Sequence, residues 1–236
     1  MNNWHKIFNK NSTYIKFTLN DLMAYSLYGI VHSFKSDIFA FKTLIKFIAK
    51  CLNIKKSSSL LDYGSGNGAF LFALKNYFSL KKNISIEINK SFINFQKKYI
   101  KDTKFYIGSN EKILKKIRSN SVDNIICNSV FQYFSTEKIA QNILLEFVRI
   151  SKKNIFLYDI KNEKYKISYK KTVRLRQNLS TSEFEKKYKN TPIRFYSKSF
   201  FLKNLNLNKK SQSIKIISMP KDTLDSKFGF CVLIKK

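Results

Sequence analysis

A glycine-rich turn between an apolar strand and an apolar helix constrains this chain more than any other feature. The run Ser59–Tyr63 predicts a buried strand, and Ala69–Phe78, apolar on nearly every side, predicts a helix packed against a sheet. Between them stand Gly64, Gly66 and Gly68, which let a ligand approach the backbone closely because they carry no Cβ. The N-terminus of the helix offers free N–H groups at the same place. The pattern therefore predicts an α/β unit with a ligand site at this turn.

From about residue 58 onward, short apolar runs alternate with amphipathic segments of helix length. This alternation favours right-handed crossovers and a mainly parallel sheet that is covered by helices on both faces. Further strands are predicted at Ile84–Glu87, Lys104–Ile107, Val122–Cys127 and Asn154–Ile160. The inward helix positions are predicted to be Ile88, Phe92, Phe95 and Tyr99, then Ile113, Leu114 and Ile117, then Ile139, Ile143, Phe147 and Ile150.

The C-terminal segment predicts a different connection. A helix around Ser197–Leu205 precedes two further strands, Ser213–Ser218 and Gly229–Ile234. Only about ten residues, Pro220 among them, separate these two strands, which is too few for a helical crossover. The last strand is therefore expected to pair antiparallel in an otherwise mostly parallel sheet.

Two stretches lie outside this rhythm. Residues 1–57 are expected to form an N-terminal helical region or lid, and residues 58–236 the α/β domain. Within that domain, residues 161–194 form a polar insertion with eleven basic and three acidic side chains, a net charge of +8. This basic lid is expected either to meet an anionic partner, such as a phosphorylated or nucleotide-linked sugar, a carboxylate or an acyl carrier protein, or to be a solvated helix pair.

The charge of the whole chain says little about a partner. Of 45 basic residues only five are arginine, against 15 acidic residues, for a net charge of +30. Lysine, asparagine, isoleucine and phenylalanine have AT-rich codons, so a biased genome explains the composition. Nucleic-acid recognition tends to use arginine for its bidentate fork. A nucleic-acid partner is therefore not expected from charge alone.

The sequence also bears on location and metals. No run of about 18 uncharged apolar residues is present, so no membrane span is expected. The first residues lack the apolar stretch and cleavage site of a secretory signal, so we expect a cytoplasmic protein. No histidine, aspartate and glutamate cluster has ligand spacing, so no metal site is expected.

Glu87 completes a predicted adenosine pocket. It lies 19 residues beyond Gly68, at the end of the second strand, where a carboxylate can accept both ribose hydroxyls. The glycine spacing also satisfies a dinucleotide pattern, with Ala69 in place of the third glycine. From these residues alone, a nicotinamide cofactor and S-adenosylmethionine both remain possible.

Five segments in order resemble the class I S-adenosylmethionine-dependent methyltransferases. They are Leu60–Gly68 with an acid before G-x-G-x-G, Gly108–Asn110 after the third strand, Val122–Phe134, Phe195–Phe201 and Phe228–Ile234. The resemblance covers roughly residues 58–236. It implies a Rossmann-like, doubly wound seven-stranded sheet with an antiparallel last strand, and S-adenosylmethionine as a cofactor that leaves as S-adenosylhomocysteine. The cofactor-binding residues that it implies are Asp62, Gly64, Ser65, Gly66, Gly68, Glu87, Ile88, Ser109, Asn110, Asn128 and Ser129.

The acceptor side is less constrained. In the related fourth motif the residues after the strand face the substrate, which makes Gln132 and Tyr133 candidates for orienting it, with Asp159 and His32 as further catalytic candidates. Asn128–Phe131 departs from the N/D-P-P-Y/F motif of amino-methylating enzymes and is more similar to small-molecule methyltransferases of bacterial natural-product and surface-glycan pathways. We therefore expect O-methylation of a hydroxyl on a secondary metabolite, polyketide or sugar. The alternatives are an RNA methyltransferase and a non-catalytic homologue that keeps the cofactor fold.

Overall fold

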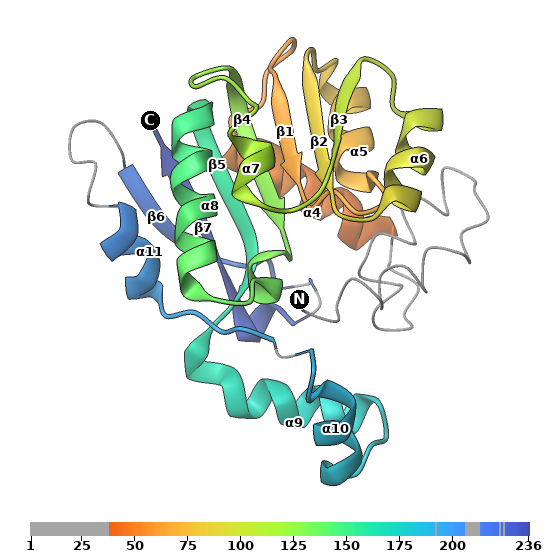
Figure 1. Cartoon of the computed structure of the whole chain (residues 1–236), viewed down its shortest axis with the longest axis vertical. Helices are drawn as coiled ribbons and strands as arrows, with labels where there is room; N and C mark the ends of the chain where they lie inside the picture. The colour runs from red at the N-terminus through yellow and green to blue at the C-terminus, as the bar shows by residue number, and fades with distance from the viewer. Residues whose placement is uncertain (1–37, 192, 206–212, 222, 224) are drawn as a thin grey trace.

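A computed structural model describes residues 38–191, 193–205, 213–221, 223 and 225–236. Its centre is one seven-stranded sheet with the strand order β3-β2-β1-β4-β5-β7-β6 (Figure 1). The strands are β1 (Leu60–Tyr63), β2 (Asn83–Glu87), β3 (Thr103–Ile107), β4 (Val122–Asn128), β5 (Ser151–Lys161), β6 (Ser213–Ser218) and β7 (Gly229–Lys235). The predicted N-terminal helical region falls mostly outside the described residues, apart from α4 (Ile38–Cys51) and the residues that follow it.

The pairing directions confirm the predicted sheet. β1, β2, β3, β4 and β5 pair in parallel, and β7 runs antiparallel to both β5 and β6. The central strands β4, β5 and β7 are mostly apolar and are buried on both faces over most of their length, as a sheet between two helical layers requires. The edge strands β3 and β6 carry Lys104 and Lys215, charges that discourage pairing with another chain.

Helices cover the sheet in two layers (Figure 1). On one face, α4 and α5 (Ala69–Phe78) pack on the strands through a cluster that includes Ile48, Leu74 and Phe156. The opposite face is covered by α7 (Glu111–Leu114), α8 (Glu137–Ile150) and α11 (Lys198–Leu205). Helix α6 (Lys90–Tyr99) links β2 to β3. The result is the doubly wound arrangement that the strand–helix alternation predicts.

Two predicted inward positions are wrong. Tyr99 is 42% exposed and Ile139 is 38% exposed. In α6 the inward line runs through Phe92 and Gln96 to Ile100 at steps of four, so the buried place expected for Tyr99 is taken by Ile100. Ile139 stands in the first turn of α8, whereas Ile143, Phe147 and Ile150 are fully buried.

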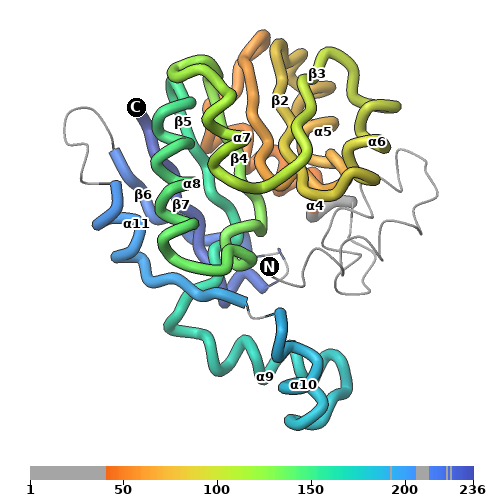
Figure 2. The backbone as a smooth tube through the Cα atoms, viewed as in Figure 1, coloured from red at the N-terminus to blue at the C-terminus, as the bar shows by residue number. Residues whose placement is uncertain are grey.

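The basic insertion is a pair of helices that stands away from the sheet. After β5 the chain passes through η3 (Glu163–Tyr165), α9 (Lys166–Arg176) and α10 (Thr181–Tyr188) before it returns to α11, as Figure 2 shows. A small cluster of buried aromatic and apolar side chains, Tyr169, Val173, Phe195 and Phe228, holds α9 to the body. The short helix η4 (Ser226–Phe228) supplies the last of them.

The strand order identifies where a ligand crevice must open. The chain runs from β1 outwards to β2 and β3 and then returns to place β4 beside β1. In open α/β sheets the crevice lies beyond the carboxyl ends of the strands at this reversal. The glycine turn after β1, Glu87 at the end of β2 and the turn after β4 all lie at that edge. Among the described residues, no helix is both long and apolar enough to cross a membrane.

Candidate cofactor and acceptor site

The glycine turn is built so that a side chain is excluded at two of its three glycines. Gly64 has φ +72°, and a Cβ there would lie 2.3 Å from a methyl of Val130. Gly68 has φ +84°, and a Cβ there would lie 2.7 Å from Cγ of Gln96 and from Cδ1 of Ile100. Both positions therefore require glycine for backbone conformation and for space. The contact with Val130 also brings the turn after β1 against the turn after β4.

Glu87 is tied to the glycine turn, as the predicted pocket requires. Its Oε2 accepts a 2.8 Å hydrogen bond from the Gly66 N–H, and its Oε1 accepts one of 2.9 Å from the Asn89 N–H. Burial raises the pKa of the Glu87 carboxyl, and these backbone hydrogen bonds partly offset the rise. A carboxylate offers about four accepting positions, and the N–H groups of Gly66, Asn89 and Ile88 approach this one, so at least one position stays available to a ribose hydroxyl.

Asp62 is a buried carboxyl without a cation. It is 1% exposed, and its Oδ2 accepts no hydrogen bond from the described residues. Burial, and then the charge of Glu87, raises the pKa of Asp62 to about 7. In the part of the chain that the structure describes, no salt bridge reaches either acid. This end of the site is therefore matched to a ligand that brings both hydrogen-bond donors and positive charge.

The other predicted cofactor residues lie around the same edge. Ser109 and Asn110 form the turn after β3, where the Tyr63 hydroxyl donates to the Ser109 carbonyl at 2.5 Å and Asn110 caps the N-terminus of α7. Ile88, half-buried, directly follows Glu87. Asn128 ends β4, and the Ser129 hydroxyl donates to Asp159 at 2.8 Å. The structure thus brings the predicted set together from four strand ends, although Asn110 also has a helix-capping role.

The predicted acceptor residues meet at the ends of β4 and β5. Gln132 and Tyr133 lie in the short helix η2 (Phe131–Tyr133), and the buried Oε1 of Gln132 accepts no hydrogen bond from the described residues. Burial, and then the neighbouring Tyr169, raises the pKa of the Tyr133 phenol far above its usual value, so the phenol stays protonated at neutral pH. Asp159 is buried at the end of β5. His32 lies outside the described residues.

Lys161 is a member of this site that the sequence did not reveal. Its buried ammonium donates to Asp159 at 2.8 Å, lies 3.7 Å from Asp225 and stands over the ring of Tyr169 at 4.9 Å. The carboxylates of Asp159 and Asp225 raise the pKa of Lys161 against the opposing effect of burial. Asp225 also binds Arg176 of α9 at 2.8 Å. Two cations and two carboxylates therefore balance, and this ionic cluster joins the lid to the strand end.

The ionic cluster gives a stability prediction. Lys161→Met leaves the buried carboxylate of Asp159 without its cation, so we expect it to lower the free energy of unfolding at pH 7 by about 3–5 kcal/mol in urea titrations. The matched control is Lys164→Met at an exposed position, which should change it by less than about 0.5 kcal/mol. An unfolding free energy for Lys161→Met within that range of the wild type would show that the cluster does not hold the lid.

The arginines of the lid serve the protein's own structure. Arg174 donates to the Leu179 carbonyl at 3.2 Å and Arg176 binds Asp225. Arg194 donates to the Phe134 carbonyl at 3.1 Å and also to the Ser135 carbonyl. These contacts favour the helix-pair interpretation of the basic insertion for its arginines and leave its exposed lysines as the side chains available to an anion.

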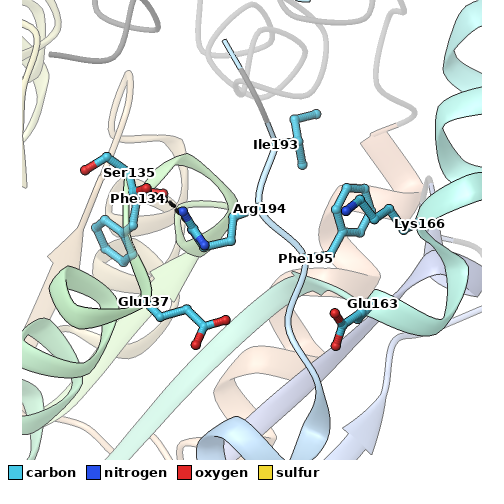
Figure 3. A pocket seen from close by; sticks show the side chains of 8 residues that line it. All are labelled: Phe134, Ser135, Glu137, Glu163, Lys166, Ile193, Arg194 and Phe195. Carbon is cyan, nitrogen blue, oxygen red and sulfur yellow. Dashed lines mark hydrogen bonds between the residues drawn. The ribbon is translucent and has the colours of Figure 1, made fainter. Parts of the chain in front are cut away.

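A pocket of about 280 Å³ lies beside η2 (Figure 3). Its wall is formed by Phe134, Ser135, Glu137, Glu163, Lys166, Ile193, Arg194 and Phe195. Figure 3 shows the carboxylates of Glu137 and Glu163 on either side of the segment that carries Arg194, whose guanidinium turns towards Ser135. The backbone N–H of Arg194 donates to the backbone carbonyl of Gln132 at 2.9 Å, so one wall of the pocket is continuous with the predicted acceptor residues. Among the described residues, no group of three or more histidine, cysteine, aspartate or glutamate side chains is arranged to hold a metal ion.

Comparisons with known proteins bear on the family and the fold. A family model described as a methyltransferase domain matches residues 54–187, more than half of the chain. No curated protein matches the chain significantly.

Three solved structures are similar to the chain. A SAM-dependent methyltransferase from Archaeoglobus fulgidus is 14% identical with a TM-score of 0.59, over 90% of this chain and 99% of that one. Magnesium protoporphyrin IX methyltransferase from Synechocystis PCC 6803, with bound SAH, is 11% identical with a TM-score of 0.58, over 98% and 92%. The small RNA methyltransferase HEN1 is 15% identical with a TM-score of 0.58, over 83% of this chain and 25% of that one. At these identities the likeness shows the fold.

Proposed function

The chain belongs to the methyltransferase-domain family, and from that premise we propose that it transfers a methyl group from S-adenosylmethionine to a hydroxyl of a small molecule. Two features of the site support the cofactor. Asp62 and Glu87 are buried acids that no described salt bridge neutralises, and S-adenosylmethionine carries an ammonium and a sulfonium. The Glu87 carboxylate retains an accepting position for a ribose hydroxyl.

The residues that would hold this cofactor lie at the carboxyl ends of β1, β2, β3 and β4. Glu87 binds the ribose, Asp62 faces the positively charged methionine end, and the turn Gly64–Gly68 lies against the chain between them. Ile88, Ser109 and Asn110 flank the adenine, and Asn128 and Ser129 lie under the methionine portion. Bound there, S-adenosylmethionine would supply an electrophilic methyl group on its sulfonium for an acceptor oxygen, with S-adenosylhomocysteine as the leaving group.

The observation that carries the acceptor assignment is the buried, unsatisfied Oε1 of Gln132. A buried acceptor without a donor costs free energy, and an acceptor substrate's O–H can supply the missing donor. The protonated Tyr133 phenol beside it orients the same oxygen. Asp159 is held in its ion pair with Lys161 and accepts from Ser129, so we assign it no role as the base, and the hydroxyl proton leaves to water when the methyl is transferred. Catalysis is then chiefly the positioning of one oxygen in line with the methyl carbon.

The test uses a variant that removes the Gln132 amide, both its unpaired oxygen and its hydrogen bond with Tyr133. Gln132→Leu keeps the side-chain size and removes the acceptor oxygen, so we expect kcat to fall about 100-fold, the effect of misplacing a reacting group, with the Kd for S-adenosylmethionine within about twofold of the wild type. Gln141→Leu, on the outer part of α8, is the matched control and should retain wild-type kinetics. Equal kcat for Gln132→Leu and the wild type on the identified acceptor would refute the assignment.

The acceptor itself is sought with a methyl-transfer assay on alcohols, sugars and carrier-bound acids, with bulk RNA in parallel. The RNA alternative is kept because HEN1 shares the fold and the chain carries a net charge of +30. All three lid arginines bind groups of the protein itself, which leaves them less available to RNA phosphates and favours a small-molecule acceptor. Methyl incorporation into RNA alone would reverse that preference.

A further inference from the structure

A buried polar network lies beneath the glycine turn and involves a residue with no assigned role. Gln96 of α6 is fully buried, and its Nε2 donates to the Gly66 carbonyl at 2.7 Å and to the Ser65 hydroxyl at 2.8 Å. Its Oε1 accepts from the Ser85 hydroxyl at 2.7 Å, and the two serine hydroxyls are 2.8 Å apart. Gln96 and its three partners, which come from β2 and the glycine turn, therefore form one connected hydrogen-bond network.

The donor directions in this network are fixed by chemistry. The Gly66 carbonyl can only accept, so the nitrogen of the Gln96 amide must face it. The amide oxygen then faces Ser85, which donates its single proton there, and the Ser65 hydroxyl must donate to Ser85. Every donor and acceptor of the Gln96 amide is used in a region without solvent. Such a fully satisfied network holds one geometry, because losing any partner leaves a buried group unpaired.

The Gly66 peptide is consequently held from both sides. Its carbonyl accepts from Gln96, and its N–H donates to Glu87 Oε2 at 2.8 Å. The same Gln96 side chain fills the space that a Cβ on Gly68 would need. One glutamine thus determines where the turn lies and, through Gly66, where the ribose-binding carboxylate of Glu87 points. We propose that Gln96 is a positioning residue that pre-forms the cofactor site before the ligand arrives.

This inference rests on S-adenosylmethionine being the cofactor, and it predicts a specific pattern of affinities. Gln96→Leu removes the donors to Gly66 and Ser65, so the Kd for S-adenosylmethionine should rise about 30-fold, the loss of two modest hydrogen bonds. The Kd for adenosine should rise by the same factor, because the ribose is common to both. At saturating cofactor, kcat should stay within about twofold of the wild type, since the acceptor side is untouched.

Two further variants distinguish a positioning role for Gln96 from a purely structural one. Phe92→Leu removes buried packing from the same helix, so it should lower the melting temperature and leave cofactor affinity unchanged. Combining Gln96→Leu with Glu87→Gln should raise the Kd less than the product of the single effects, because both act on the ribose contact. If Gln96→Leu does not fold, Ser85→Ala removes one hydroxyl of the same network and should raise the Kd by a smaller factor.

The outcomes distinguish the two proposals. A wild-type protein that does not bind S-adenosylmethionine overturns the proposed function. A wild type that binds, together with a folded Gln96→Leu that binds S-adenosylmethionine and adenosine as tightly, overturns the positioning role of Gln96 alone. That role is also overturned if Phe92→Leu and Gln96→Leu, matched for loss of stability, lose affinity equally.

Discussion

Replacing Asp62 by asparagine is expected to make the protein more stable at pH 8 and to weaken S-adenosylmethionine binding about 100-fold. The pKa of Asp62 is raised from 3.8 to about 7 by burial and then by Glu87. Because the folded state binds this proton more tightly than the unfolded chain, the associated stability is present below about pH 3.8 and is lost as the pH rises to about 7. At pH 8 the ionised side chain costs about 4 kcal/mol.

Asparagine removes this pH dependence, although its buried amide also lacks partners, at a cost of about 1–3 kcal/mol. The stability advantage of Asp62→Asn should therefore grow by about 3 kcal/mol between pH 5 and pH 8 in urea titrations. The exposed carboxyl of Asp102, which pairs with Lys75, provides the control: Asp102→Asn should show no such growth. A parallel pH dependence in Asp62→Asn and the wild type would contradict the raised pKa of Asp62.

The binding loss has the same electrostatic origin. When the charge of a carboxylate that faces the ligand's ammonium is removed, the binding free energy of the ligand weakens by about 2–5 kcal/mol. Adenosine carries no ammonium, so its Kd should stay within about threefold of the wild type. Binding of S-adenosylmethionine by the wild type should also weaken as the pH falls below about 7, because the protonated Asp62 must release its proton on binding. Calorimetry in buffers of different ionisation enthalpy measures that proton release.

Replacing Glu87 by glutamine should give a different pattern of loss. Glutamine keeps one oxygen to accept from Gly66 but turns an N–H₂ group towards the Asn89 N–H, and it loses the charge that strengthens the ribose hydrogen bonds. We expect the Kd values for S-adenosylmethionine, S-adenosylhomocysteine and adenosine all to rise about 30- to 100-fold, since charged hydrogen bonds contribute about 1.5–3 kcal/mol.

The contrast between the two acids is the informative result. Asp62→Asn should spare adenosine, and Glu87→Gln should not. Glu111→Gln changes a partly exposed acid in the first turn of α7, serves as the control and should leave all three affinities unchanged. If Glu87→Gln binds adenosine normally while it loses S-adenosylmethionine, the ribose assignment is wrong.

Much of the fold could be predicted from local pattern. The apolar runs at Val122–Cys127 and Asn154–Ile160 indicate buried strands because both faces of these strands are covered. The short connection before Gly229 determined the antiparallel direction, because ten residues do not reach back to the other end of the sheet. The position of Glu87 beside the glycine turn was also predictable from local pattern, because a strand that ends beside such a turn leaves few places for its last side chain.

The interactions that complete the site could not be predicted this way. Lys161 and Asp225 are 64 positions apart, and Gln96 reaches Ser65 across 31 positions, so each contact depends on which elements the sheet order places together. Gln96 did carry one local signal, because it follows Phe92 by four residues and so shares the inward face of α6. Lys161 carried none, because a lysine at a strand end in a chain with 45 basic residues is an ordinary solvated side chain until the fold surrounds it.

The crevice at Asp62 and Glu87 should bind a methyl donor and not a dinucleotide. Isothermal titration calorimetry of the full chain with S-adenosylmethionine, S-adenosylhomocysteine and NAD distinguishes the two. We expect one-to-one binding of the first two, stronger for S-adenosylmethionine at pH 8 than at pH 6, and no measurable heat with NAD. Binding of NAD without binding of S-adenosylmethionine would show that the crevice is a dinucleotide site.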